Sequence, residues 1–387
     1  MVPFGAEEYR NRLNRIREQM VMEKINLLFV TSPEGMCYLH GYQANWYQAN
    51  SPEVWPSLSG TAVHVDHDKI IHFDFIDEKN LLKATSIVED IRFYPTFSLD
   101  GLSFMVKELN KEGWLKGCVG LEIGSYRPKR TLNLAMESAF INHGCKVKDS
   151  TALLKNVRSI KSKQEIKYIE EAARIVEAGH LAVRACLKPG MSELDLAAEL
   201  NYAMMKQGGE QAGLILALRS GPLASFHGMP TRRVIRHGDL VVMDPCGVVN
   251  RYHANQARAY YIGNPPKELI SRYKIAGDAF KLFGETAGAN IAIATANKVM
   301  RQYYEEHGIW ELRDWVGGYE LGLSFPPDWV GEFLFSVEDE EPVGYFHAGM
   351  VTNFESTLQT FLIDTFIYEE SGARVLSKLE PELIVID

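Results

Sequence analysis

Helical and strand-like patterns alternate along the first 155 residues of the chain. Residues 7–23 carry the charged, amphipathic pattern of a helix, and residues 25–32 (INLLFVTS) form a short apolar run that ends at turn formers, as a buried strand does. Residues 61–75 (TAVHVDHDKIIHFDF) alternate apolar and polar side chains, which predicts two strands joined by a turn near Asp68. A helical pattern and a further strand follow at residues 103–114 and 116–123. This alternation predicts a first α/β domain over residues 1–155.

The three histidines of the predicted strand pair need an interpretation of their own. A strand with one exposed face places every second side chain in solvent. We therefore interpret them as surface positions rather than as metal ligands. They are His64, His67 and His72.

A long helical pattern marks the start of a second domain. Residues 153–175 read LLKNVRSIKSKQEIKYIEEAARI, where a basic, polar connection gives way to a helix with apolar residues at Ile166, Ile169, Ala173 and Val176. This helix ends at LKPG, residues 187–190. Ser192, with Asp195 three residues later, predicts a capping box at the start of the next helix. We expect the second domain to span residues 156–387.

Strand patterns dominate the second domain after its first two helices. The strand-like runs lie at 214–220, 240–247, 257–263 and within 345–387, with a helical return at 266–307. A chain of 387 residues exceeds what one hydrophobic core usually serves, which is roughly 250 to 300 residues. We therefore expect two domains of mixed α/β (α+β) class.

Charge and composition exclude several classes of function. A net charge of -9 argues against a nucleic-acid partner, and no apolar run approaches the roughly 18 residues that span a bilayer. The first thirty residues are too charged for a signal peptide. The five cysteines are odd in number and scattered, which suggests reduced thiols. We expect a cytoplasmic protein that does not bind membranes.

His227 is the first candidate for chemistry. It lies beside Gly, Met and Pro in a stretch rich in turn formers, seventeen residues before Asp244. A loop histidine can carry a proton near neutral pH, although a structural histidine is the alternative.

Two lone acids on apolar, strand-like runs form the second candidate. Asp244 ends the run LVVM, and Glu355 lies in GMVTNFESTLQTFLID. An unpaired charge in such surroundings is costly, so each acid needs a metal, a cation or hydrogen-bond donors. Either could instead tie down a neighbouring loop. Cys246, two residues after Asp244, is interpreted as a buried thiol.

Residues 317–332 (GGYELGLSFPPDWVGE) form the third candidate. Glycines let a backbone pass close to a ligand, and the Pro-Pro pair stiffens the turn. The run supplies a phenol, two carboxylates and an aromatic wall, from Tyr319, Asp328, Glu332 and Trp329.

Aromatic side chains are concentrated between residues 41 and 57. Aromatic faces attract alkylated or delocalised cations, so the stretch could line a pocket for a small cationic or zwitterionic solute. It could equally be a dimer contact or a covered edge of the core. The residues are Tyr42, Trp46, Tyr47 and Trp55.

Together these segments resemble the superfamily of creatinase, aminopeptidase P and prolidase, the pita-bread proteins. The resemblance covers nearly the whole chain and is most specific from His227 through RRVIRHGDLVVMD to Arg258. It implies a creatinase-like N-terminal α/β domain, in which residues 31–42 (TSPEGMCYLHGY) correspond to a strand, a turn and a strand, and a C-terminal pita-bread domain. It also implies that His227 is the active-site histidine and Asp244 the first metal-binding Asp.

The chain departs from the metallopeptidases of this superfamily, which hold two metal ions with two Asp, one His and two Glu. Asn255 stands at the second Asp position, Tyr319 at the His position and Ile363 at the last Glu position, so that Asp244 and Glu355 remain. Two carboxylates with an amide, a phenol and an alkyl group are a poor cage for paired divalent ions. We expect no dinuclear metal centre and no other cofactor.

The resemblance is nearest to creatinase and ectoine hydrolase, which hydrolyse C–N bonds in small zwitterions without catalytic metal. Residues 318–332 are similar to the corresponding loop of ectoine hydrolases. Ala257, however, stands where those enzymes carry a Glu just before Arg258, and Cys246 stands where a Glu or Asp is sometimes found. Either the substrate differs or the activity is lost.

We predict a metal-independent hydrolase of an amide, amidine or guanidine bond in a small zwitterionic, nitrogenous solute. His227 would act as the base and then protonate the leaving nitrogen. Asp244 or Glu355 would orient water or hold the cationic end of the substrate, while Tyr319 and His253 would donate hydrogen bonds to a developing oxyanion. The residues expected to bind the substrate are Trp46, Tyr47, Trp55, His253, Arg258, Asp328 and Trp329.

Three alternatives stay open. The first is a metal-dependent Xaa-Pro dipeptidase or aminopeptidase with two divalent ions, and the second is a lyase of the dimethylsulfoniopropionate type, which is disfavoured because such lyases keep their metal ligands. The third is a non-catalytic, solute-binding homologue. The resemblance also implies a homodimer, in which the aromatic residues of 42–55 could reach the partner's site.

Overall fold

The computed structural model describes residues 2–48, 58–95, 101–221, 224 and 227–387. The chain divides into two compact units, residues 1–158 and 159–387. Among the described residues, every helix is too short or too polar to cross a membrane.

The N-terminal unit is built on one six-stranded sheet. Its helices are α1 (Ala6–Glu23), α2 (Pro33–His40), α3 (Lys79–Thr85), α4 (Gly101–Lys111), α5 (Arg130–Asn142) and α6 (Thr151–Ser159), with short 3-10 turns η1 (Trp46–Gln48) and η2 (Ile76–Glu78). Its strands are β1 (Leu27–Val30), β2 (Gly60–His64), β3 (Ile70–Phe75), β4 (Asp90–Tyr94), β5 (Cys118–Leu121) and β6 (Lys146–Asp149), in the order β4-β3-β2-β1-β5-β6. Strands β1, β2 and β3 pair antiparallel, whereas β3 with β4, β1 with β5 and β5 with β6 pair parallel. This confirms the α/β class.

Two predictions for this unit are wrong. Residues 33–40 form helix α2 rather than a turn and a strand, because the Ser32 hydroxyl accepts a hydrogen bond from the backbone N–H of Gly35 and Pro33 occupies the first turn. His72, predicted to be exposed, is completely buried. Its ring nitrogens contact Thr61 Oγ1 at 2.9 Å and Asp74 Oδ2 at 3.3 Å, so the polar ring is satisfied inside the sheet.

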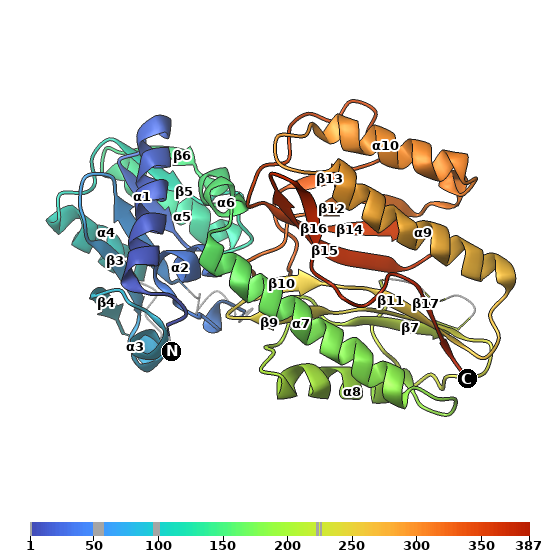
Figure 1. The fold of residues 1–387 in the computed structure, drawn as a ribbon. Coiled ribbons are helices and arrows are strands. Elements are labelled where there is room, and N and C mark those ends of the chain that lie inside the picture. Colours follow the sequence, from blue (N-terminus) through green and yellow to red (C-terminus); the bar gives the residue numbers. More distant parts are fainter. Residues whose placement is uncertain (1, 49–57, 96–100, 222–223, 225–226) are drawn as a thin grey trace. The chain divides into compact units, whose positions relative to one another are not determined.

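The C-terminal unit contains two curved sheets, each covered by a pair of helices (Figure 1). The helices are α7 (Lys163–Cys186), α8 (Glu193–Lys206), α9 (Lys267–Thr286) and α10 (Ile293–Glu306), with the 3-10 turn η3 (Trp310–Leu312). The strands are β7 (Ala217–Gly221), β8 (Leu240–Asp244), β9 (Cys246–Val249), β10 (Tyr252–Asn255), β11 (Arg258–Ile262), β12 (Trp315–Tyr319), β13 (Leu334–Ser336), β14 (Val351–Thr357), β15 (Leu362–Glu369), β16 (Gly372–Val375) and β17 (Leu383–Ile386).

This unit has two hydrophobic cores, and the four-stranded sheet contributes to both, with Met243 in one and Val242 in the other. The sheet β17-β11-β8-β7 packs against α7 and α8 through residues such as Val176, Leu200 and Met243. The sheet β13-β12-β14-β15-β16 packs against α9 and α10 through an aromatic core that includes Phe283 and Phe354, whose rings stack at 4.2 Å. This helix-covered pair of sheets, with the β10-β9 ribbon, is the pita-bread fold.

Helix starts in this unit follow local sequence signals. The capping box predicted at Ser192 is confirmed: its hydroxyl accepts from the backbone N–H of Asp195, and the Asp195 carboxylate accepts from the backbone N–H of Ser192. Ser162 and Glu165 form a second capping box at the start of α7.

Candidate active site between the strands of the C-terminal unit

The site is built around Asp244, the last residue of β8. Its side chain is buried, and its Oδ1 accepts a hydrogen bond of 2.6 Å from Asn255 Nδ2. Burial raises the pKa of Asp244 to about 6, although the hydrogen bond from Asn255 opposes the rise. Asp244, at the end of β8, is therefore an acid that changes its charge near neutral pH.

Asn255 is the last residue of β10, and hydrogen bonds hold both its backbone N–H and its backbone carbonyl. Thr365 Oγ1 accepts from the backbone N–H of Asn255 at 2.9 Å and donates to its carbonyl at 2.8 Å. The side-chain Nδ2 also donates to the carbonyl of Pro245 at 3.1 Å. Cys246, which pairs with Asn255, is buried, and burial followed by the charge of Asp244 raises the pKa of its thiol.

Glu355, on β14, is the second acid of the cluster around Asp244. Its Oε1 accepts from Asn353 Nδ2 at 2.8 Å, and the same nitrogen donates to Asn255 Oδ1 at 3.2 Å. Burial, followed by the charge of Asp244, raises the pKa of Glu355 to about 8, while hydrogen bonds from Asn353 and Tyr319 oppose the rise. The structure thus joins the two lone acids of the sequence into one cluster.

Tyr319, at the end of β12, is the third member of the cluster. Its hydroxyl accepts from the Trp329 indole at 3.2 Å, and its backbone N–H donates to Asn353 Oδ1 at 2.8 Å. Burial, and then the charges of Glu355 and Asp244, raise the pKa of Tyr319, so the phenol keeps its proton at neutral pH. A neutral phenol can donate to a substrate oxygen.

The loop after β12 buries Trp329 and exposes Asp328. The Asp328 Oδ1 accepts from the backbone N–H groups of Trp329 at 2.7 Å and Val330 at 3.1 Å, so this carboxylate stabilises its own loop. Trp329, predicted to bind the substrate, contacts the cluster through Tyr319.

Lys161 and Glu320 form a buried ion pair at the base of this loop, with Nζ and Oε1 2.5 Å apart. The backbone N–H of Glu320 also donates to the carbonyl of Phe333, which closes the loop at its neck. Sequence reasoning missed this pair, because the polar stretch around Lys161 resembles a solvated linker. It also missed Asn353, which the alternation of a strand places on the same face as Glu355.

His253 has a structural role, which argues against its predicted contact with substrate. The ring is completely buried, with Nδ1 2.9 Å from the carbonyl of Arg251 and Nε2 accepting from the backbone N–H of Gly213 at 3.0 Å. Both nitrogens are therefore occupied by backbone groups. Burial, followed by the charge of Arg251, lowers the pKa of His253 to about 3.

The contacts of Arg258 likewise argue against its predicted role in binding the substrate. It is completely buried, and its Nη2 lies 3.0 Å from each oxygen of Asp364. Asp364 is next to Ile363 and Thr365 on β15, but successive side chains of a strand point to opposite faces. The remaining hydrogen bonds of Arg258 go to the Ser377 hydroxyl and to the carbonyls of Ala257, Ile363, Leu379 and Glu380.

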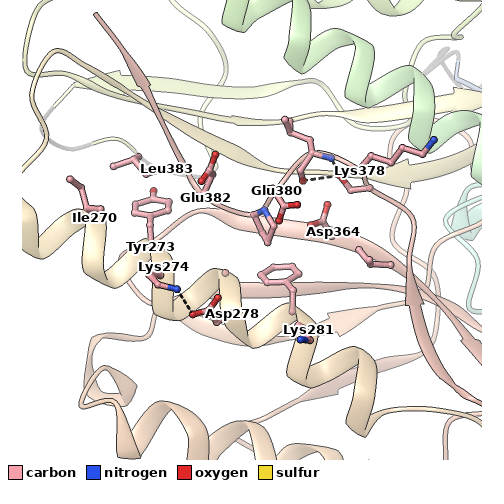
Figure 2. Close-up of a pocket in the computed structure, with 16 residues that line it drawn as sticks. Ile270, Tyr273, Lys274, Asp278, Lys281, Asp364, Lys378, Glu380, Glu382 and Leu383 are labelled. Atoms are coloured by element: carbon pink, nitrogen blue, oxygen red, sulfur yellow. Dashed lines mark hydrogen bonds and ion pairs between the residues drawn. The ribbon is translucent and has the colours of Figure 1, made fainter.

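A cavity of about 660 Å³ lies on that opposite face. Figure 2 shows Asp364 between helix α9, which carries Tyr273 and Lys281, and the segment with Glu380 and Glu382. The acid cluster of Asp244 and Glu355 does not line this cavity. Arg258 and Asp364 thus hold the last strands together behind the candidate site.

His227 is exposed in the loop that follows β7. The carbonyl of the next residue, Gly228, accepts from the backbone N–H of Leu218 at 2.8 Å, and Ala217, beside Leu218, pairs with Asp244 across the sheet. The residue after His227 is therefore hydrogen-bonded to β7 beside the strand pair at which β8 ends with Asp244.

The aromatic residues of the N-terminal unit are described only in part. Trp46 and Tyr47 lie on η1, where Tyr47 is buried and Trp46 half-buried. Trp55 lies outside the described residues. Their predicted contact with substrate stays a prediction.

The donor set of the cluster does not fit a dinuclear metal centre. Asn255 and Asn353 turn N–H groups, rather than oxygens, toward Asp244 and Glu355, and Ile363 lies opposite Glu355 on the neighbouring strand. Within the described residues, no three or more His, Cys, Asp or Glu side chains are grouped to hold a metal ion.

The two units match two known protein families. Residues 12–160 match the creatinase/prolidase N-terminal domain, and residues 167–377 match metallopeptidase family M24. A creatinase-type domain followed by a pita-bread unit with an acid cluster between its strands defines the class. Since the second match spans more than half of the sequence, the chain belongs to metallopeptidase family M24, a family of hydrolases.

Similar proteins carry different activities. The chain is 26% identical to the ectoine hydrolase of Halomonas elongata over 99% of this chain and 98% of that one. It is 24% identical to the Xaa-Pro dipeptidase of Pyrococcus furiosus over 97% and 100%.

Solved structures share the fold. The prolidase of Thermococcus sibiricus superposes with a TM-score of 0.82 at 19% identity, covering 99% of this chain and 100% of that one. The X-Pro aminopeptidase of Thermotoga maritima has a TM-score of 0.79 at 21% identity, covering 97% and 99%. These likenesses establish the fold, and the substrate has to be argued from the site.

Proposed function

We propose that the chain hydrolyses a C–N bond, in an amide, amidine or guanidine group, of a small zwitterionic solute without a catalytic metal. The observation that carries the proposal is the acid cluster: Asn255 and Asn353 donate hydrogen bonds to Asp244 and Glu355, the two acids that remain of the family's metal-ligand set. The similarity to an ectoine hydrolase over nearly the full length supports the same chemistry.

The acid cluster suits a substrate with a cationic end. Asp244 is buried and Glu355 is half-buried, and their charges act on one another, so the positive charge of a protonated amine or amidinium would offset both carboxylates. Tyr319 keeps its proton and, by turning its hydroxyl away from Glu355, can donate to an oxyanion that develops on the substrate. The Trp329 indole donates to the Tyr319 hydroxyl of this cluster.

We assign the proton transfers to His227, on the sequence argument and on its place at the β8 edge of the sheet. Its imidazole would accept the proton of the attacking water and then deliver it to the leaving nitrogen, so that one group serves both steps.

The test is hydrolysis of a solute panel headed by ectoine and creatine, with chelator-treated protein. His227→Ala is expected to abolish turnover while the far-UV circular dichroism stays unchanged. His237→Ala removes another exposed histidine of the same loop region and is the matched control. Near-normal turnover by His227→Ala would exclude the assignment.

A metal-dependent Xaa-Pro dipeptidase is the second candidate, favoured by the similarity to the Pyrococcus furiosus dipeptidase. Cleavage of Xaa-Pro dipeptides that stops with chelator and returns with manganese would establish it. Binding of a solute without turnover would instead indicate a non-catalytic homologue.

We further propose that the chain works as a homodimer, as the resemblance to its superfamily implies, and that it is cytoplasmic. Light scattering of the purified protein tests the dimer, and a monomeric mass would exclude it.

A further inference from the structure

Asn353 contacts three other residues of the acid cluster through its side chain. It lies on β14, completely buried, two residues before Glu355. Its Oδ1 accepts from the backbone N–H of Tyr319, and its Nδ2 donates to Asn255 Oδ1 and to Glu355 Oε1. A backbone N–H can act only as a donor, so the amide of Asn353 can point only one way.

The amide of Asn255 is oriented by the same kind of contact. Its Nδ2 donates to the carbonyl of Pro245, and a carbonyl can only accept. The same nitrogen therefore faces Asp244 Oδ1, and the amide oxygen faces Asn353. The two amides are connected head to tail, from Asn353 through Asn255 to Asp244.

This arrangement links four strands of the two sheets and the ribbon through side chains. Asp244 ends β8, Asn255 ends β10, Asn353 and Glu355 lie on β14, and Tyr319 ends β12. One oxygen of each acid is held by an amide N–H. Within the described residues, Oδ2 of Asp244 has no hydrogen-bond partner, so this oxygen is available to a ligand.

We propose that Asn353 is a positioning residue that, through Asn255, sets the direction in which Asp244 and Glu355 present their remaining oxygens to the substrate. The inference rests on the proposed function for the identity of that substrate. The geometry of the two amides is independent of the proposed function, and a measurement on the unliganded protein can test it.

Asn353→Asp is the decisive variant. The two side chains have nearly the same shape, and one oxygen can still accept from the backbone N–H of Tyr319. The other oxygen replaces the donor that faces Asn255 Oδ1, and an amide oxygen can only accept, so this contact is lost whatever the charge of Glu355. The variant therefore breaks the head-to-tail connection with little change in packing.

Asn297→Asp is the matched control. Asn297 lies on α10, is buried, and donates from Nδ2 to the carbonyl of Ser336 at 2.7 Å. It thus undergoes the same chemical change at a buried amide outside the cluster. Asn353→Ser serves as a second variant of the cluster that adds no charge, should Asn353→Asp not fold.

The first readout is the side-chain NH₂ signal of Asn255 in protein labelled with ¹⁵N-asparagine, assigned with Asn255→Ser. We expect Asn353→Asp or Asn353→Ser to shift this signal, and Asn297→Asp to leave it in place. The second readout is kcat/KM on the solute that the panel identifies. We expect the Asn353 variants to lose about tenfold to a hundredfold, the range for an oriented hydrogen bond to a charged group, and Asn297→Asp to lose little.

An unchanged Asn255 signal in the Asn353 variants would overturn the proposal, as would equal losses of kcat/KM in the Asn353 and Asn297 variants. If the wild-type protein hydrolyses nothing in the panel, the proposed function fails while the NH₂ signal still decides whether Asn353 orients Asn255.

Discussion

Replacement of Glu355 by Gln is expected to stabilise the folded protein in mildly alkaline solution. Burial, and then the charge of Asp244, raises the pKa of Glu355 from 4.5 to about 8. A carboxyl whose pKa is higher in the folded than in the unfolded chain binds its proton more tightly in the folded chain. Its contribution to stability is therefore complete below the unfolded pKa and is lost as the pH rises through about 8.

The size of the effect follows from that shift. One pKa unit corresponds to about 1.36 kcal/mol, so a rise from 4.5 to about 8 corresponds to at most about 5 kcal/mol. Asp244 titrates in the same cluster, so part of this free energy belongs to the pair, and we expect about 2 to 5 kcal/mol for Glu355. Gln has nearly the shape of a protonated Glu and cannot ionise. Glu355→Gln should match the wild type near about pH 5 and exceed its stability near about pH 9.

Urea unfolding, followed by tryptophan fluorescence across this pH range, measures the difference. Glu193→Gln is the control with the opposite sign. Burial would raise the pKa of Glu193, but hydrogen bonds from Ser220 and Thr231 outweigh burial and lower it. Glu193→Gln should therefore lose stability near neutral pH, with the loss shrinking as the pH falls. A Glu355→Gln protein that is no more stable than the wild type near about pH 9 would refute the reasoning.

Three further predictions concern the surroundings of the cluster. Asp364→Asn should cost about 3 to 5 kcal/mol in thermal or urea unfolding, because it leaves the buried Arg258 guanidinium without its anion; wild-type stability would show that the pair is dispensable. Tyr319→Phe should cost about 1 to 3 kcal/mol and alter tryptophan fluorescence, since the buried Trp329 indole loses its acceptor; an unchanged spectrum would contradict the contact. Plasma mass spectrometry of protein incubated with manganese, iron or zinc should find no tightly held metal, and two ions per chain would instead favour the dipeptidase.

The elements of the fold could be predicted because their signals are local. The capping box at Ser192 needs only residues three apart, and the periodicity from Ile166 to Val176 depends on one helix alone. Asp244 and Glu355 were candidates for a similar reason: each is a lone acid in an apolar run, and burial of a charge calls for a partner wherever the run packs.

Burial of polar side chains was not local and was predicted poorly. His72 alternates with apolar neighbours as an exposed residue would, yet Thr61 and Asp74 satisfy its ring inside the sheet. His253 and Arg258 lie within three residues of Asn255 in sequence, but their side chains bond to groups outside the cluster, such as the backbone of Gly213 and the Asp364 carboxylate.

The sequence by itself determined the α/β class of the chain and predicted Asp244 and Glu355 as candidate site residues, each a lone acid in an apolar run. The tertiary structure alone decided how these acids are held. The donors that reach them come from β10, β12 and β14, of which β12 and β14 lie far from β8 along the chain, and the strand register sets which amide faces which oxygen. A hydrogen bond acts within about 3 Å and depends on direction, so its partners are known only when the strands are in place.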